Sequence, residues 1–402
     1  MKKFFTFVFI SFLGFSLFAQ TGVKFEFQHK IGDSYSYIST VQEDVFINNV
    51  LSHHSEIINR ISSTVQNVTS DGEGFIDASY MTTENTISNR SGRNLTWGDE
   101  EISFFARKKS GELTISNNIF MPTVRNVPVF PKEKIKIGQT WTADGKEVHD
   151  LRTAFNMKKP LIIPFTANYK YTGNVIENGK TLNVIQVEYD FYYQNTRENL
   201  LRGQTLLESA GFSKQTLYWD NKKGLLDHYD EEFQIQIADI YQNIYTFQGS
   251  AKAEITEFKS VNNDKTLHSL QEEVAQMDLN DISITKGEKG LTISLENIQF
   301  EPDSNVLRAS EKIKLEKIAQ LLQNYSNDLL ITGHCAERGT ENARQILSEE
   351  RAQSVASYLI ELGLRDEYHI FTQGKGSTEP VASNETEEGR SRNRRVEIII
   401  MD

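Results

Sequence analysis

The chain has 402 residues, and its 43 Lys and Arg against 55 Asp and Glu give a formal net charge of -12 at pH 7. Such an acidic chain repels phosphates, which argues against a nucleic-acid partner and against nonspecific binding to anionic membranes. The single cysteine, Cys335, excludes an internal disulfide, so stability must come from apolar cores, for which the length allows two or more domains.

Residues 1–19 have the pattern of a cleavable secretory signal. A basic start, "MKK", precedes an apolar run that ends at Phe18, and the small Ala19 stands before the expected cut. The run is shorter than the roughly 20 residues that a transmembrane helix needs. A lipoprotein signal requires a cysteine at the cut, and Cys335 lies far from it. We therefore expect a periplasmic protein without a lipid anchor, either free or associated with the outer membrane or the cell wall.

Residues 20–260 predict an all-β domain. Short segments alternate apolar and polar residues, as in "EEFQIQIADIY", and turn signals separate them. Asn178-Gly179 suits a two-residue hairpin, because both residues tolerate the positive φ angles of a type I′ turn. The pattern fits an antiparallel open sheet, a sandwich or a soluble barrel. Membrane-spanning strands are disfavoured because charges interrupt nearly every candidate strand, as in "FFARKKSGELTI".

Residues 261–280 predict a linker, in which a polar stretch is followed by the helix-compatible "LHSLQEEVAQMDL". A polar connector favours a flexible joint between two domains.

Residues 281–402 change pattern and predict an α/β domain, because candidate strands alternate with candidate helices. The strands are "GLTISLENIQF", "DLLITGH", "YHIFTQG" and "RRVEIII". In the first helix, "SEKIKLEKIAQLLQNY", one face carries Ile313, Ile318, Leu321 and Leu322. The second helix, "LSEERAQSVASYLIELG", has Ser348 as its expected N-cap and ends at Gly363.

This second domain resembles the OmpA-like peptidoglycan-binding domain. The matching phrases are "IQFEPDSNVL", "GHCAERGT", "LSEERAQSVASYLIELGL" and "TQGKGSTEPVASNETEEGRSRNRRVEI", which run in family order between Ile293 and Ile400. The resemblance implies a βαβαββ-type fold, with helices on one mixed sheet. It also implies a ligand, the diamino acid of the peptidoglycan stem peptide, commonly diaminopimelate. It implies neither catalysis nor a cofactor.

The resemblance carries one of the family's two ligand-binding residues onto this chain. In the family, an aspartate two positions after the glycine-histidine pair accepts from the ligand ammonium, and an arginine fifteen residues later forks onto its carboxylate. Arg351 stands at the arginine position, whereas the aspartate position holds Ala336. Loss of one hydrogen bond to a charged group costs about 1.5–3 kcal/mol, roughly tenfold to hundredfold in affinity.

Three hypotheses follow from the missing aspartate. Arg344 and Arg351 together favour a ligand richer in carboxylates; Glu337 or Asp303 replaces the lost acid; or the domain has lost wall binding. The resemblance also places an apolar pocket residue at Leu347. Asn393 and Arg394 match the family's closing phrase, and the alternative for them is a structural clamp on the C-terminal strand or its preceding loop. For Arg351 the alternative is a surface charge paired with a helix glutamate.

The sequence offers no catalytic or metal-binding constellation. Cys335 and its neighbour His334 point to opposite faces of a strand, so the histidine cannot activate the thiol, which suits a small packing role. His53 and His54 are adjacent rather than spaced for one ion. "GKGSTEP" lacks the frame of a phosphate-binding loop.

These observations predict a non-enzymatic periplasmic cell-envelope protein without a cofactor. Its C-terminal domain binds the peptidoglycan stem peptide, and its β domain links the wall to an outer-membrane or other envelope component. The alternative is an interaction protein whose degenerate C-terminal domain no longer binds peptidoglycan. A third hypothesis makes the β domain a carrier of a lipid or another apolar molecule.

Overall fold

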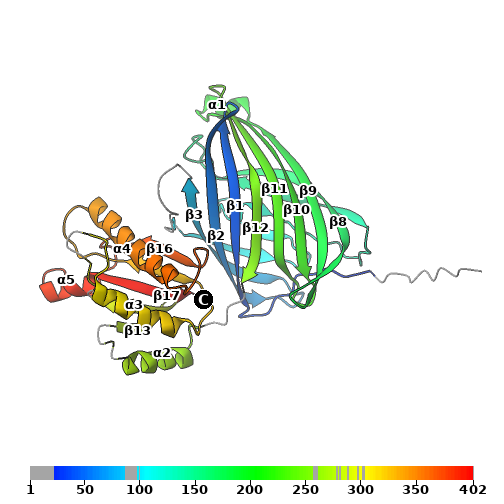
Figure 1. The fold of residues 1–402 in the computed structure, drawn as a ribbon. Helices are drawn as coiled ribbons and strands as arrows, with labels where there is room; N and C mark the ends of the chain where they lie inside the picture. The colour runs from blue at the N-terminus through cyan, green and yellow to red at the C-terminus, as the bar shows by residue number, and fades with distance from the viewer. Residues whose placement is uncertain are drawn as a thin grey trace, which may run out of the picture.

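The computed structural model describes residues 22–86, 97–98, 100–256, 261–277, 279, 282–287, 289–296, 298–300 and 304–401. The predicted signal, residues 1–19, lies outside this set. The described residues form two sheets, one of twelve strands and one of five. In Figure 1 the smaller sheet and its helices lie beside β2 and β3 of the larger one, with the C-terminus at the junction.

The larger sheet is an antiparallel meander in the order β5-β4-β3-β2-β1-β12-β11-β10-β9-β8-β7-β6, which confirms the predicted all-β domain. Its strands are β1 (Ser34–Ile47), β2 (Val50–Val68), β3 (Gly74–Thr86), β4 (Glu101–Arg107), β5 (Leu113–Ile115), β6 (Val124–Arg125), β7 (Thr140–His149), β8 (Leu161–Glu177), β9 (Lys180–Gln194), β10 (Leu206–Asp220), β11 (Leu225–Asp239) and β12 (Ile244–Thr256). One short helix, α1 (Arg197–Leu201), connects β9 to β10.

The hairpin between β8 and β9 has the predicted turn. Asn178 and Gly179 have φ angles of 48° and 75°, the two positive values that a type I′ turn requires. The sheet that these hairpins build is strongly curved (Figure 1). Tyr80 of β3 and Glu147 of β7, near opposite ends of the strand order, therefore line one cavity on its concave side.

The smaller sheet belongs to the C-terminal module, the name used here for residues 261–401 as far as they are described. Its order is β13-β14-β17-β15-β16, and the β15–β16 pair is parallel, which confirms the predicted mixed α/β fold. Its elements are α2 (Asp264–Gln276), β13 (Ile282–Gly287), β14 (Gly290–Glu296), α3 (Ala309–Leu322), β15 (Leu329–Gly333), α4 (Glu341–Glu361), β16 (Ile370–Gly374), α5 (Glu387–Asn393) and β17 (Arg395–Met401). Leu270 and Val274 of α2 join the module's core, so the packed unit begins before residue 281.

Two details of the predicted helices are wrong. Helix α4 begins at Glu341, where the Thr340 hydroxyl accepts from the Ala343 amide, and Ser348 is not the N-cap but lies in the buried middle of the helix. Ile313 is 56% exposed, because the buried face of α3 is formed by Leu315, Ile318, Leu321 and Leu322. Three of the four predicted residues are therefore on the buried face, and Leu315 takes the place expected for Ile313.

The module packs against the β domain, which differs from the flexible joint that the polar connector favours. Arg60 of β2 forms an ion pair with Asp328, with Nε 2.8 Å from Oδ2, and the two side chains are 3% and 0% exposed. Beside this pair the rings of Trp97 and Phe371 pack at a tilt of 45° with their centroids 4.2 Å apart, and the Trp97 amide donates to the Thr372 carbonyl. The same apolar cluster contains Ile58, Met81, Leu330, Ile399 and Met401.

Alternation along β15 and β17 explains why both faces of the module's sheet are buried. Leu329 and Ile331 pack under the helices, whereas Leu330 between them points into the contact with the β domain. On β17, Ile398 faces the helices and Ile399 faces the β domain. Continuous apolar runs are what a strand buried on both faces produces.

A buried charge network fixes the end of β15. His334 Nε2 lies 3.4 Å from Glu397 Oε2, and Arg395 Nε lies 2.7 Å from Glu397 Oε1. Burial alone would raise the pKa of Glu397, but the hydrogen bond and charge of His334 and the ion pair with Arg395 outweigh it and lower that pKa to about 2. The network ties β17 to the segment that follows β15.

We expect Arg60→Ala to lower the free energy of unfolding by about 3–5 kcal/mol, because it leaves the buried Asp328 carboxylate without its countercharge. The measurement is denaturant unfolding of the full chain. Arg202→Ala is the matched control: Arg202 pairs with Glu198 at a surface site where both side chains are over 70% exposed, so its loss should stay below about 1 kcal/mol. Equal losses for the two variants would contradict a buried joint.

Stability should fall in acid partly through Glu397. Because the folded-state pKa is about 2 and the ordinary value is 4.5, the stabilisation is complete above the ordinary value and is lost as pH falls toward the lower one. In Glu397→Gln we expect lower stability at neutral pH and a shallower decline over that range, measured by denaturant midpoints at a series of pH values. Glu388→Gln, an exposed change on α5, should keep the wild-type slope.

Candidate functional site

The candidate site lies where β15 ends against α4. After Gly333 the chain continues through His334, Cys335 and Ala336, all buried, and the Cys335 amide donates to the Gly376 carbonyl at 2.7 Å. A Cβ at Gly333 would lie 2.0 Å from the Ser348 carbonyl oxygen. Glycine at this position therefore lets α4 approach the strand closely.

Arg344 and Arg351 converge on this strand end. They are seven residues apart on α4, which is close to two turns, so they lie on the same side of the helix. Burial raises the pKa of the Cys335 thiol, and the charges of Arg351 and Arg344 oppose that rise. The charges of both guanidinium groups therefore act on the thiol next to Ala336, the residue at the family's aspartate position.

Arg351 is held by an aromatic ring. Its Cζ lies 4.9 Å from the ring centroid of Phe300, which is itself 7% exposed. A cation over a ring face contributes about 0.5–2 kcal/mol. The half-buried guanidinium is thus positioned by packing, which supports a pocket role more than that of a mobile surface charge.

The guanidinium of Arg344 has one nitrogen in a hydrogen bond and another without a hydrogen-bond partner among the described residues. Its Nη1 donates to the Gly339 carbonyl at 2.6 Å, which fixes the loop after β15. Its Nε is buried and has no hydrogen-bond partner among the described residues. Arg344 and Lys375 line a hollow of about 580 Å³, the Arg344 hollow. Such a donor is suited to a carboxylate oxygen.

The remaining predicted residues divide between the site's edge and a structural clamp. Leu347 is half-buried on α4, and Glu337 is exposed. Asn393 accepts from the Val381 and Ala382 amides and donates to the Ala382 carbonyl, so it holds the loop before α5. Arg394 pairs with a glutamate of α5 at 2.8 Å. These contacts favour the clamp for Asn393 and Arg394. Asp303 lies outside the described residues.

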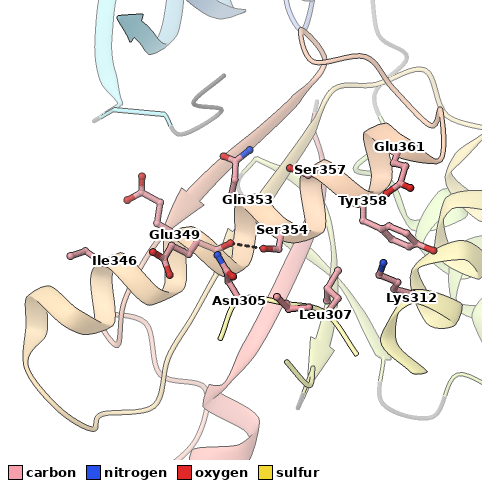
Figure 2. A pocket seen from close by; sticks show the side chains of 12 residues that line it. Asn305, Leu307, Lys312, Ile346, Glu349, Gln353, Ser354, Ser357, Tyr358 and Glu361 are labelled. Atoms are coloured by element: carbon pink, nitrogen blue, oxygen red, sulfur yellow. Dashed lines mark hydrogen bonds between the residues drawn. The ribbon is translucent and has the colours of Figure 1, made fainter. Parts of the chain in front are cut away.

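A second concavity, the α4 groove, lies between α4 and residues 305–312, which lead into α3 (Figure 2). It holds about 570 Å³ and is lined by residues such as Leu307, Lys312, Glu349 and Tyr358. Figure 2 shows the Ser354 hydroxyl donating to the Glu350 carbonyl, which keeps that side chain against the helix. None of the predicted binding residues that the structure describes lines this groove. The sequence did not point to it, because its glutamates look like ordinary surface charges of a helix.

Neither a metal cluster nor a membrane-crossing helix is found in the part of the chain that the structure describes. There, no three His, Cys, Asp or Glu side chains are arranged to hold an ion. No described helix is both long enough and apolar enough to span a bilayer.

Comparison with known proteins identifies the module. The model of the OmpA family matches residues 299–394. The chain is similar to the peptidoglycan-binding protein ArfA of Mycobacterium tuberculosis, with 47% identity over 104 residues that cover 26% of this chain and 32% of that protein. It is also similar to the peptidoglycan-associated lipoprotein of Buchnera aphidicola, with 31% identity over 162 residues that cover 39% of this chain and 80% of the relative.

Among solved structures, the cell wall anchor of the T6SS from Pseudomonas aeruginosa is 29% identical, with a TM-score of 0.30, over 33% of this chain and 97% of that one. The chain spans about half the length of two further relatives, 53% and 55% of each. The family model leaves the β domain outside its match. Through its C-terminal module, the chain belongs to the OmpA family.

Proposed function

We propose that this chain is a non-enzymatic periplasmic protein of the cell envelope, which binds the stem peptide of peptidoglycan through its C-terminal module. The observation that carries the proposal is the convergence of Arg344 and Arg351 on the buried end of β15, with Arg344 Nε left without a hydrogen-bond partner among the described residues. The names of two relatives, a peptidoglycan-binding protein and a peptidoglycan-associated lipoprotein, support the same ligand.

The two arginines favour the carboxylate end of the ligand. A guanidinium offers parallel donors that match a carboxylate, and partial burial strengthens the contact. The ammonium end has a weaker site, because Ala336 cannot accept a hydrogen bond and Glu337 is exposed. Affinity therefore depends mainly on the free carboxylates of the stem peptide, and we expect it to be lower than in relatives that keep the aspartate.

The β domain provides the second attachment. Its buried contact with the module, centred on Arg60 and Asp328, holds the two domains in one orientation. A module bound to the wall would therefore present the curved sheet in a fixed direction. We infer that the β domain links the wall to another component of the envelope, either at the outer membrane or in the periplasm.

The second candidate function is that of an interaction protein whose module no longer binds the wall. The observation in its favour is Ala336, which is buried and apolar where the family has its ammonium acceptor. In that case the module would serve only as the packing partner of the β domain.

Sedimentation with purified peptidoglycan sacculi separates the two functions, with the full chain used because the module packs on the β domain. We expect wild type to sediment, Arg351→Ala to lose most binding, and Ala336→Asp to bind roughly tenfold to hundredfold more tightly, because a carboxylate there supplies the missing acceptor. Arg392→Ala is the matched control, since Arg392 pairs with Glu296 on the surface. If only Ala336→Asp sediments, the module has lost its ligand.

Amidation of the ligand tests the carboxylate preference directly. Soluble stem peptides with a free and an amidated diamino-acid carboxylate should differ by roughly tenfold or more in affinity for wild type, because amidation removes the charge that the arginines bind. The measurement is calorimetric titration. Arg351→Ala should bind both peptides with nearly equal affinity, and an undiminished difference in this variant would assign the carboxylate to another residue.

A further inference from the structure

The concave side of the β domain contains a cavity of about 540 Å³, the β cavity. This volume lies in the range of about 300–1,000 Å³ that small-molecule sites occupy. Ile57 and Ile61 of β2 face it from one side, and Phe233 and Ile235 of β11 face it from the other. All four side chains keep some accessible surface, so the sheet's own apolar residues do not fill the space.

Three carboxyl groups line this otherwise apolar space: Glu43 of β1, Glu147 of β7 and Glu231 of β11. Glu231 Oε1 accepts from Ser213 at 2.6 Å and from Gln215 at 3.1 Å. No hydrogen bond reaches its Oε2 from any residue that the structure describes. Burial raises the pKa of Glu231 to about 7, although the two hydrogen bonds oppose this and nearby Glu147 adds to it.

Glu43 is in a similar position. No described residue donates a hydrogen bond to its carboxyl group. Burial, with a smaller effect of Glu84, raises the pKa of Glu43 to about 7. A carboxylate enclosed by protein without donors is costly, and a ligand that brings a donor removes part of that cost.

His149 supplies an independent sign of an absent partner. Its side chain is 9% exposed and lines the β cavity, and Nε2 has no hydrogen-bond partner among the described residues. This nitrogen lies 3.5 Å from Glu147 Oε2, whose other oxygen accepts from the Tyr189 hydroxyl at 2.7 Å. The polar groups of the cavity are thus only partly satisfied by one another.

The cavity also lacks positive charge. None of the described residues that line it is a lysine or arginine. The buried Arg125, on the segment between β5 and β7 that covers the cavity, instead donates to the carbonyls of Ile119 and Phe120 at 2.6 and 3.3 Å. Fatty acids and other anionic amphiphiles would therefore meet three carboxyl groups and no described lysine or arginine side chain in the lining, so the site disfavours them.

We propose that the β cavity binds an amphiphile with an apolar chain and a cationic amine head group. The chain would lie along the aliphatic and aromatic side chains of β2 and β11, and the ammonium would donate to Glu231 and Glu43. This site is separate from the two arginines of the C-terminal module, and binding to one does not require binding to the other.

Three probes with the same chain and different head groups test the proposal: dodecylamine, dodecanol and dodecanoate, titrated calorimetrically below their micelle concentrations into the full chain. Dodecylamine should bind roughly tenfold or more tightly than the other two, because only it brings a charged donor. Equal affinities for the amine and the carboxylate, or no binding of the amine, would overturn the proposal.

Variants locate the head group. Glu231→Gln keeps the shape of the side chain and should remove most of the preference for the amine while leaving dodecanol affinity unchanged; Glu43→Gln tests the same point if the first variant does not fold. Glu232→Gln, on the opposite face of β11, is the matched control and should behave as wild type. An amine preference that survives in both cavity variants would exclude these carboxyl groups as the binding site.

The pH profile gives a readout that loss of structure would not imitate. Glu231 shares the cavity lining with Glu43, Tyr80, Glu147, His149 and Tyr229, its charge also acts on Tyr189 of β9, and no described lining residue is a lysine or arginine. Alkylamines stay protonated through neutral pH, so amine affinity should rise as pH passes upward through about 7 and these carboxyl groups ionise. Dodecanol affinity should not change, and a parallel change for both probes would count against the charge pair.

Discussion

The pairing of β1 with β12 is the contact on which the rest of the structure depends. It joins strands that lie about two hundred residues apart in sequence, from Ser36 opposite Thr256 to Ile47 opposite Tyr245. Without it the meander would consist of two separate sheets. With it, Glu43 of β1 and Glu231 of β11 face one cavity, and the outer side of β2 becomes a continuous surface against which the module can pack. Such long-range pairing forms late and slowly in folding, because loop closure must precede it.

The sequence predicts local structure well and long-range contacts poorly. The period of two along the N-terminal half and the turn at Asn178-Gly179 follow from neighbouring residues, and both are found in the structure. The β1–β12 pairing leaves no such local trace. Ser348 shows the same limit. Its sequence context suits an N-cap, but the hydroxyl of the earlier Thr340 accepts from the Ala343 amide and caps the helix. The helix continues through Ser348, which packs against Gly333 and Gly374 of the sheet.

The sequence does contain a sign of the packed contact between the two domains, although the polar composition of the connector hides it. A polar connector suggests a flexible link, yet the runs at Leu329-Leu330-Ile331 and Ile398-Ile399-Ile400 have no polar residue for a wet face. Strands of this kind need cover on both sides, and the helices supply only one.

For the candidate site the resemblance supplied Arg351, but the convergence of Arg344 on the same strand end and the ring of Phe300 under Arg351 depend on how α4 packs. The cavity of the β domain could not be predicted, since its walls come from strands distributed over the whole sheet.

Strand β2 separates the β cavity from the C-terminal module. Ile57, Asn59 and Ile61 face the β cavity, while Ile58 and Arg60 between them face the module. Side chains alternate strictly along a strand, so a shift by one residue exchanges the two sets. An insertion or deletion in this strand would direct the Arg60 guanidinium into the cavity and withdraw the countercharge from Asp328 in the same step. The register of this one strand therefore connects the interior of the β domain to the position of the C-terminal module, and an error in it could not damage one without the other.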